Sequence, residues 1–165
     1  MADGEVGELF SRISCVFDGC WKNPEITAQA FCGQWCSVGD MARSDADGYI
    51  HLVDRKTNLI VSGGENIYPS EVEGVLGAHP KVKDVAVIGV PDAKWGEAVR
   101  AVIVLHDGQQ LDEAEVLAYC RDRLAGYKRP RSVIFITNAA MPRTATGKIL
   151  RRKLREQLVT TQEVV

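Results

Sequence analysis

The chain has 165 residues, of which 45% are hydrophobic and 25% charged, and these proportions are typical of a globular domain rather than a disordered or fibrous chain. No run approaches the roughly 18 apolar residues of a membrane span, and the N-terminus lacks the basic-then-apolar order of a signal peptide. We therefore expect a cytoplasmic protein without a membrane span.

The cysteines indicate reduced thiols, because they are odd in number and scattered through a chain that is large enough to fold without disulfides. Cys32 and Cys36 lie four residues apart, but no second cysteine or histidine pair completes a zinc site. We expect no bound metal in this chain. The five are Cys15, Cys20, Cys32, Cys36 and Cys120.

The net charge of −2 conceals an asymmetry along the chain. Residues 127–155 hold nine of the 20 Lys and Arg and no Asp or Glu, which leaves 11 cations elsewhere against 22 acidic residues. Such a stretch is either a solvated face or a surface for an anionic partner, and the composition leaves both open. Nucleic acid is not the expected partner, since the chain has no recognition-helix signature and is acidic as a whole.

Residues 1–53 predict a β-rich region with one short helix. The segments are a strand within residues 4–10, a helix over 24–31, and strands over 35–40 and 49–53. The last two strands are joined by Asp45-Ala46-Asp47-Gly48, which resembles part of a calcium loop but lacks the closing Glu, so we expect a hairpin turn. The region is short of helices and apolar residues for a core of its own, and we expect it to pack against further chain.

Residues 54 onward predict an α+β domain. Apolar residues 59–61 are followed by Gly63-Gly64 and then by Pro69 at the start of a helix that ends near Gly77, which indicates a strand, a turn and a helix. Two adjacent glycines serve either an ordinary turn or the close approach of another molecule to the backbone. Further strands are expected over 82–90, 97–105 and 133–136, with a loose tail from Thr160.

Two more helices are expected in this region. Asp112 and Glu115 make a capping-box-like start for the first of them. The second is expected over residues 147–158, with Thr146 as its cap and Lys148 in its first turn. A lysine there opposes the helix dipole, and a bound anion would remove the conflict; an exposed, solvated lysine is the alternative.

Two other places could bind a ligand. Trp95 lies between two expected strands, so we expect it to be partly exposed, either as a platform for a flat ring or as a cover for the core. Residues 127–131 set Tyr127 among cations before a proline, which suits a phosphate or a nucleotide as well as it suits a solvated loop. No nucleophile–base pair and no Walker-type phosphate loop is present.

Six segments in order resemble the motifs of the AMP-forming acyl-CoA synthetases, the adenylate-forming superfamily that also includes luciferases and the adenylation domains of peptide synthetases. The resemblance extends from Gly4 to about Leu158. The segments are Gly4-Glu5-Val6-Gly7-Glu8, residues 19–25, Gly39-Asp40, Asp54-Arg55-Lys56, residues 62–73 and residues 142–148.

The resemblance implies a two-step enzyme. A carboxylic acid and ATP, with Mg²⁺, form an acyl-adenylate, and the acyl group then passes to CoA. Residues 1–53 would be the end of a large N-terminal domain that is otherwise missing, residues 54–57 a hinge, and residues 58–165 a mobile C-terminal domain. The implied sites are Lys148 for catalysis, Asp40 and Arg55 for ATP or AMP, Thr57 for the hinge, and Ser62, Gly63, Gly64, Trp95, Tyr127 and Arg129 for CoA.

The chain departs from the family pattern at two places. Thr57 stands where the hinge usually has Asp or Lys, and Cys36-Ser37-Val38 replaces the usual polar lead into Gly39-Asp40. Because the phosphate loop and the acyl pocket would precede Met1, we expect the chain alone to be inactive.

The resemblance also suggests a modification, and two alternatives to a CoA ligase remain open. The Pro142-to-Lys148 pattern resembles a recognition site for a lysine acetyltransferase that would act on Lys148. The alternatives to a CoA ligase are an adenylation domain that uses a carrier protein, and a stand-alone binding or assembly module without catalysis.

Overall fold

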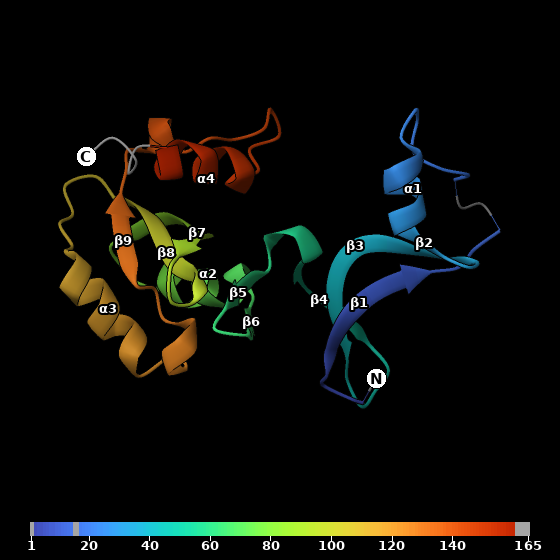
Figure 1. Cartoon of the computed structure of the whole chain (residues 1–165). Coiled ribbons are helices and arrows are strands. Elements are labelled where there is room, and N and C mark those ends of the chain that lie inside the picture. The colour runs from blue at the N-terminus through green and yellow to red at the C-terminus, as the bar shows by residue number, and fades with distance from the viewer. Residues whose placement is uncertain (1, 15–16, 161–165) are drawn as a thin grey trace. The chain divides into compact units, whose positions relative to one another are not determined.

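The computed structural model describes residues 2–14 and 17–160 and divides into two compact units (Figure 1). The first unit ends at Thr57 and the second begins at Asn58. A short 3-10 turn, η1 (Lys56–Asn58), contains this boundary.

The first unit is built around one long strand. β3 (Trp35–Ser44) pairs antiparallel with β1 (Val6–Ser11), β2 (Phe31–Cys32) and β4 (Ile50–Arg55). The expected helix is present as α1 (Pro24–Ala30), with Pro24 in its first turn and Asn23 as its cap; Ile26 N donates to Asn23 Oδ1 at 3.1 Å. The expected hairpin turn is also present, since Gly48 N donates to Asp45 O at 3.0 Å.

The first unit leaves much of its apolar surface uncovered. Among its described residues only Cys36 and Ala42 are buried hydrophobics, whereas Trp21, Tyr49 and Leu52 are 87%, 68% and 66% exposed. The described residues of this unit therefore form no hydrophobic core of their own.

The second unit has one five-stranded sheet with helices on both faces. β7 and β8 form a long antiparallel hairpin, β9 runs parallel to β8, and β5 pairs with β6 and with the start of β8. The elements are β5 (Ile60–Ser62), β6 (Glu65–Ile67), α2 (Pro69–Gly77), β7 (Val82–Asp92), β8 (Gly96–Leu105), α3 (Glu113–Arg121), η2 (Gly126–Lys128), β9 (Ser132–Phe135), η3 (Asn138–Ala140) and α4 (Arg151–Thr160).

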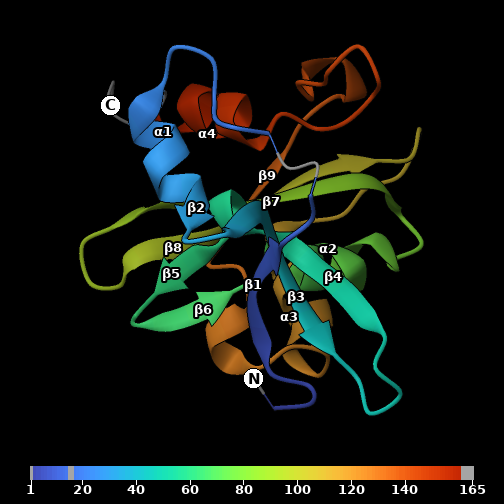
Figure 2. The same ribbon diagram turned by 90° about the vertical axis from the view of Figure 1, so that its right-hand side faces the viewer.

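The two faces of the sheet carry separate apolar clusters, because successive strand residues point to opposite sides. Val85 and Val87 of β7 pack in the cluster with α2 and α3, and Ala86 and Ile88 pack in the cluster with Leu154 of α4. Figure 2 shows α3 and α4 on opposite sides of this sheet. Burial on both faces explains why the two long strands read as continuous apolar runs.

The α+β class is confirmed, and two local expectations are wrong. The Gly63-Gly64 turn leads into β6 before α2 begins, so it closes a β-hairpin rather than joining a strand directly to a helix. The last helix begins at Arg151 rather than at residue 147. Lys148 therefore does not lie in a first helical turn, Thr146 is not its cap, and the argument from the helix dipole fails.

Four described cysteines are free thiols: Cys20, Cys32, Cys36 and Cys120. Cys15 and residues 161–165, where the loose tail was expected, lie outside the described residues.

Candidate functional site

Asp40 and Arg55 form an ion pair across two strands. They lie opposite each other on β3 and β4, and Arg55 Nε lies 2.9 Å from Asp40 Oδ1. The Asp40 side chain is 22% exposed and that of Arg55 is 66% exposed. A carboxylate has more acceptor positions than one guanidinium contact uses, so Asp40 can also accept hydrogen bonds from ligand hydroxyls.

The Gly63-Gly64 turn lies directly against Trp95. Gly63 N donates to Trp95 O at 2.8 Å, and a Cβ at Gly63 would lie 2.6 Å from Trp95 Cε3. A Cβ at Gly64 would have no atom within 4 Å. Gly63 is therefore required to be small by a contact inside the unit, and only Gly64 presents an open face. Ser62, which the resemblance assigns to the CoA site together with the two glycines, is 6% exposed, and its backbone pairs with that of Gly96 in the sheet.

Trp95 lies between β7 and β8 and is partly exposed, as expected from the sequence. Two cations lie over its ring: Lys94 Nζ is 4.7 Å and Arg131 Cζ is 4.8 Å from the centroid. Asp92 fixes the turn, because its Oδ1 accepts hydrogen bonds from Trp95 N and Lys94 N, both at 2.9 Å. The bond from Trp95 N, followed by that from Lys94 N, holds the pKa of Asp92 below its ordinary value.

Residues 127–131, which follow α3, contribute one cation to the surface around Trp95 and one to the end of α3, a division that the sequence did not indicate. Tyr127, in η2, is 44% exposed. The Arg129 guanidinium is engaged internally, since Nε donates to Leu124 O at 2.9 Å and Nη2 donates to Arg121 O at 2.6 Å. It thus satisfies the carbonyl of Arg121, the last residue of α3, where cations are favoured, and that of Leu124 just beyond the helix. Arg131, which lies in the expected 127–131 segment but was not among the implied CoA residues, is the cation of this segment that reaches Trp95.

Lys148 lies in a loop that closes on itself. Thr144 N donates to Lys148 O at 2.8 Å, Lys148 N donates to Thr144 Oγ1 at 3.1 Å, and Leu150 N donates to Pro142 O at 2.9 Å. The Lys148 side chain is exposed, and no ion pair within the described part of the chain involves its ammonium. A fixed backbone thus presents a cation that is available to an anion.

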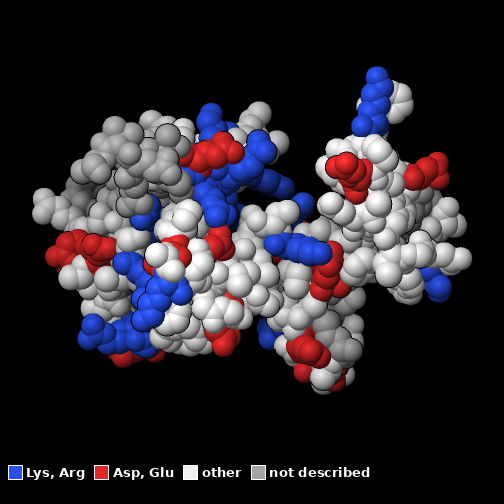
Figure 3. Space-filling view, viewed as in Figure 1, with Lys and Arg blue, Asp and Glu red and all other residues white. Residues whose placement is uncertain are grey.

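The basic stretch of residues 127–155 is partly paired within the second unit. Figure 3 shows red atoms among the blue ones on this part of the surface. Three arginines of the stretch pair with carboxylates on other elements: Arg143 with Asp84, Arg151 with Glu73 and Arg155 with Glu97. The stretch is therefore neither wholly a solvated face nor wholly a surface for a partner.

Residues 71–148 match one protein family, described as the AMP-binding enzyme C-terminal domain. The second unit carries an AMP-binding enzyme C-terminal domain. The matched range begins in α2 and ends at Lys148, so it spans the core of the unit and the loop just described.

Several acyl-CoA synthetases and ligases resemble the chain over nearly its whole length. The chain is 49% identical over 154 residues to a feruloyl-CoA synthase of Amycolatopsis sp., and this alignment covers 93% of the chain and 31% of that protein. It is 43% identical over 162 residues to a 2-succinylbenzoate–CoA ligase of Geobacillus kaustophilus, and this alignment covers 98% of the chain and 33% of that protein. The chain thus spans about a third of the length of these relatives.

Solved structures give the same result. ATP-bound MatB from Rhodopseudomonas palustris matches with a TM-score of 0.89 and 37% identity, over 98% of this chain and 32% of that one. The o-succinylbenzoate CoA synthetase of Bacillus subtilis, in complex with its acyl-adenylate, matches with a TM-score of 0.83 and 36% identity, over 94% and 31%. The expected resemblance to the C-terminal portion of AMP-forming acyl-CoA synthetases is confirmed.

Two absences concern only the described residues. No helix there has the length and apolar character needed to cross a bilayer. No group of three or more His, Cys, Asp or Glu side chains there could hold a metal ion.

Proposed function

We propose that this chain is the C-terminal part of an AMP-forming acid–CoA ligase. Such an enzyme condenses a carboxylic acid with ATP to an acyl-adenylate, with release of pyrophosphate, and then transfers the acyl group to the thiol of CoA. The observation that carries the proposal is the match to the AMP-binding enzyme C-terminal domain over residues 71–148, which includes Lys148 and its exposed ammonium on a fixed loop.

In the first step Lys148 would lie between the attacking carboxylate and the α-phosphate. Negative charge develops at the phosphate as the acid attacks, and an ammonium held in place there stabilises that charge at no cost of reorganisation. Asp40 would accept hydrogen bonds from the ribose hydroxyls while Arg55 keeps its carboxylate oriented, as the 2.9 Å contact supports. Mg²⁺ is expected to enter with ATP.

In the second step the surface around Trp95 would face CoA. Gly64 has the open face that a pantetheine chain needs, and Ser62 and Gly63 hold the turn beside it. Tyr127 and the cations of residues 129–131 would contact the nucleotide, with Arg129 also anchoring the segment to α3. Lys148 and this surface would serve in turn, as the second unit rotates about residues 54–57 with Thr57 at the hinge.

The two half-reactions test this proposal in the full-length protein. Lys148→Ala should abolish formation of the adenylate and spare formation of the thioester from a supplied adenylate. Lys153→Ala is the matched control, because Lys153 is an exposed lysine of α4 outside the proposed site. Equal loss of both half-reactions in Lys148→Ala would refute the alternating roles.

The chain by itself is proposed to be inactive. Its first unit exposes Trp21, Tyr49 and Leu52, and the described residues of that unit form no core of their own, which supports a surface that packs on further chain. Release of pyrophosphate by the pure chain with ATP and a carboxylic acid would contradict this.

The acceptor is proposed to be CoA rather than a carrier protein. The relatives named above are called CoA synthases or ligases, and the Trp95 surface carries the cations that a nucleotide phosphate requires. Isothermal titration with CoA and with dephospho-CoA distinguishes the two, since a carrier-protein domain would bind neither. The names of the relatives include acids as different as ferulate and long-chain fatty acids, so similarity over this chain does not indicate which acid is activated.

A stand-alone module without catalysis is the second candidate. It is favoured by the same uncovered apolar surface of the first unit, which would then hold a second copy. Sedimentation of the chain over a range of concentrations tests it, because a monomer at every concentration would argue against such a module.

Two further proposals concern the setting of the protein. The cytoplasm is the proposed compartment, in keeping with the four free thiols among the described residues. Acetylation of Lys148 would remove the charge that the first step needs, and peptide mass spectrometry after incubation with an acetyltransferase would detect it.

A further inference from the structure

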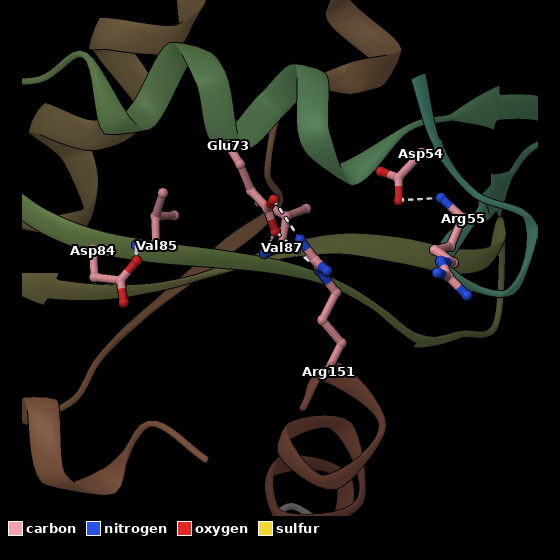
Figure 4. Close-up of polar contacts among 7 residues, drawn as sticks. All are labelled: Asp54, Arg55, Glu73, Asp84, Val85, Val87 and Arg151. Atoms are coloured by element: carbon pink, nitrogen blue, oxygen red, sulfur yellow. Dashed lines mark hydrogen bonds and ion pairs between the residues drawn. The ribbon is translucent and has the colours of Figure 1, made fainter. Parts of the chain in front are cut away.

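The loop that carries Lys148 is attached at both ends to one edge of the sheet. β7 is the outer strand of the sheet order, so alternate backbone N–H groups of β7 point away from β8. Two carboxylates cap them: Val85 N donates to Asp84 Oδ1 at 2.9 Å, and Val87 N donates to Glu73 Oε1 at 2.8 Å (Figure 4).

Each of these carboxylates also binds an arginine from beside the Lys148 loop. Arg151, the first residue of α4, donates through Nε to Glu73 Oε1 at 3.1 Å and through Nη2 to Glu73 Oε2 at 2.6 Å. Arg143, at the other end of the loop, donates through Nη2 to Asp84 Oδ2. Figure 4 shows Glu73 reaching from α2 toward both β7 and Arg151.

Arg143 reaches into the loop as well. Its Nη1 donates to Gly147 O at 3.0 Å, which fixes the carbonyl immediately before Lys148. The Glu73 and Arg151 side chains are 15% and 28% exposed, so this pair is sheltered from solvent and screened less than a surface pair. The bidentate geometry of the pair also restricts its orientation.

We propose that Glu73 and Asp84 are positioning residues for Lys148. They hold the loop between Arg143 and Arg151 at the edge of β7, and thereby fix where the ammonium stands when the adenylate forms. The inference rests on the proposed role of Lys148. It predicts that loss of either carboxylate impairs the first half-reaction selectively, because the second half-reaction uses the surface around Trp95.

The variants remove charge and keep shape. Glu73→Gln retains an acceptor for Val87 N and loses the charge that Arg151 pairs with, and Arg151→Met breaks the same pair from the other side. Glu71→Gln is the matched control: it lies on the same helix, and its carboxylate pairs with Lys128 Nζ at 2.7 Å, away from the loop.

Two measurements are made on each variant. Amide hydrogen exchange of the chain reports on the loop, through the protected N–H groups of Gly147, Lys148 and Leu150. The two half-reactions of the full-length protein report on function. We expect faster exchange at these three amides and a loss of about tenfold to hundredfold in adenylate formation, the scale of a displacement near 1 Å. Thioester formation from a supplied adenylate should change by less than about twofold on the same scale.

The double variant Glu73→Gln with Arg151→Met should be no worse than either single variant, because both remove one interaction. Unchanged loop exchange, equal loss in both half-reactions, or the same effects in Glu71→Gln would overturn the inference. If Lys148→Ala itself leaves adenylate formation intact, the proposed function fails, and the exchange data still decide whether these carboxylates order the loop.

Discussion

Replacing Gly63 with alanine should destabilise the second unit more than the same change at Gly64. Both glycines have positive φ angles, of 60° and 85°, which a residue with a side chain adopts at a cost of about 1–2 kcal/mol. Only at Gly63 does the new Cβ also meet a neighbour, at 2.6 Å from Trp95 Cε3 and 3.0 Å from Cζ3.

The contact determines the size of the difference. A Cβ at 2.6 Å forces the ring of Trp95 to move, and Trp95 is itself tied by its backbone to Gly63 and Asp92. Overpacking of this kind costs about 1–3 kcal/mol. We therefore expect a total of roughly 2–5 kcal/mol for Gly63→Ala against about 1–2 kcal/mol for Gly64→Ala.

Urea unfolding followed by far-UV circular dichroism measures this difference. Three of the four described α-helices belong to the second unit, so the signal reports mainly on that unit. In a Trp95→Ala background the ring is gone, and both alanine variants should then cost about 1–2 kcal/mol. Equal losses for Gly63→Ala and Gly64→Ala in the parent chain would refute the packing argument.

Three further outcomes are expected. Arg129→Ala should lower stability by about 1–3 kcal/mol, since it removes charged donors from the carbonyls of Arg121 and Leu124. Arg131→Ala should lose a cation–π contact of about 0.5–1 kcal/mol and an attraction to Asp92 that solvent screens, and urea titration compares the two variants. Burial lowers the pKa of His79, whose Nδ1 accepts a hydrogen bond from Lys81 N at 3.2 Å. As the pH falls below about 6.5, His79 therefore binds a proton more readily in the unfolded chain than in the folded chain. Stability should thus fall as the pH drops below about 6.5, and His79→Gln should flatten this dependence in urea titrations at pH 5 to 8. Asp40→Asn should raise the KM for ATP about tenfold or more in the full-length protein, by weakening a charge-assisted bond to ribose, and an unchanged KM would remove Asp40 from the site.

Structural features that depend on residues close together in the sequence were predicted well. Asp112 and Glu115 form the expected capping box, because its two hydrogen bonds join residues only three apart. Pro69 begins α2 as expected, because its fixed φ and missing N–H suit a first helical residue.

The two misplaced elements have local causes as well. β6 has only three residues, Glu65–Ile67, which is too short for an apolar alternation to show. The last helix starts late because Thr144 bonds to Lys148 in both directions, and these hydrogen bonds compete with a helical turn at the same residues.

Most contacts of the candidate site join residues that are far apart in the sequence. Glu73 and Arg151 are 78 positions apart, and nothing in either neighbourhood of the sequence indicates the partner. The same holds for Gly63 with Trp95 and for Trp95 with Arg131. Asp40 was identified by the family resemblance alone. Lys148 was also singled out by an argument from the helix dipole, which fails because α4 begins at Arg151.

The carboxylates on β7 have a consequence for the behaviour of the protein in concentrated solution. An 11-residue, largely apolar outer strand is a template on which a strand from another molecule can add. Glu73 and Asp84 already occupy two of the N–H groups that an added strand would use, and the arginines paired with them lie beside that edge. Replacement of both carboxylates by apolar side chains should therefore promote edge-to-edge aggregation of the folded protein.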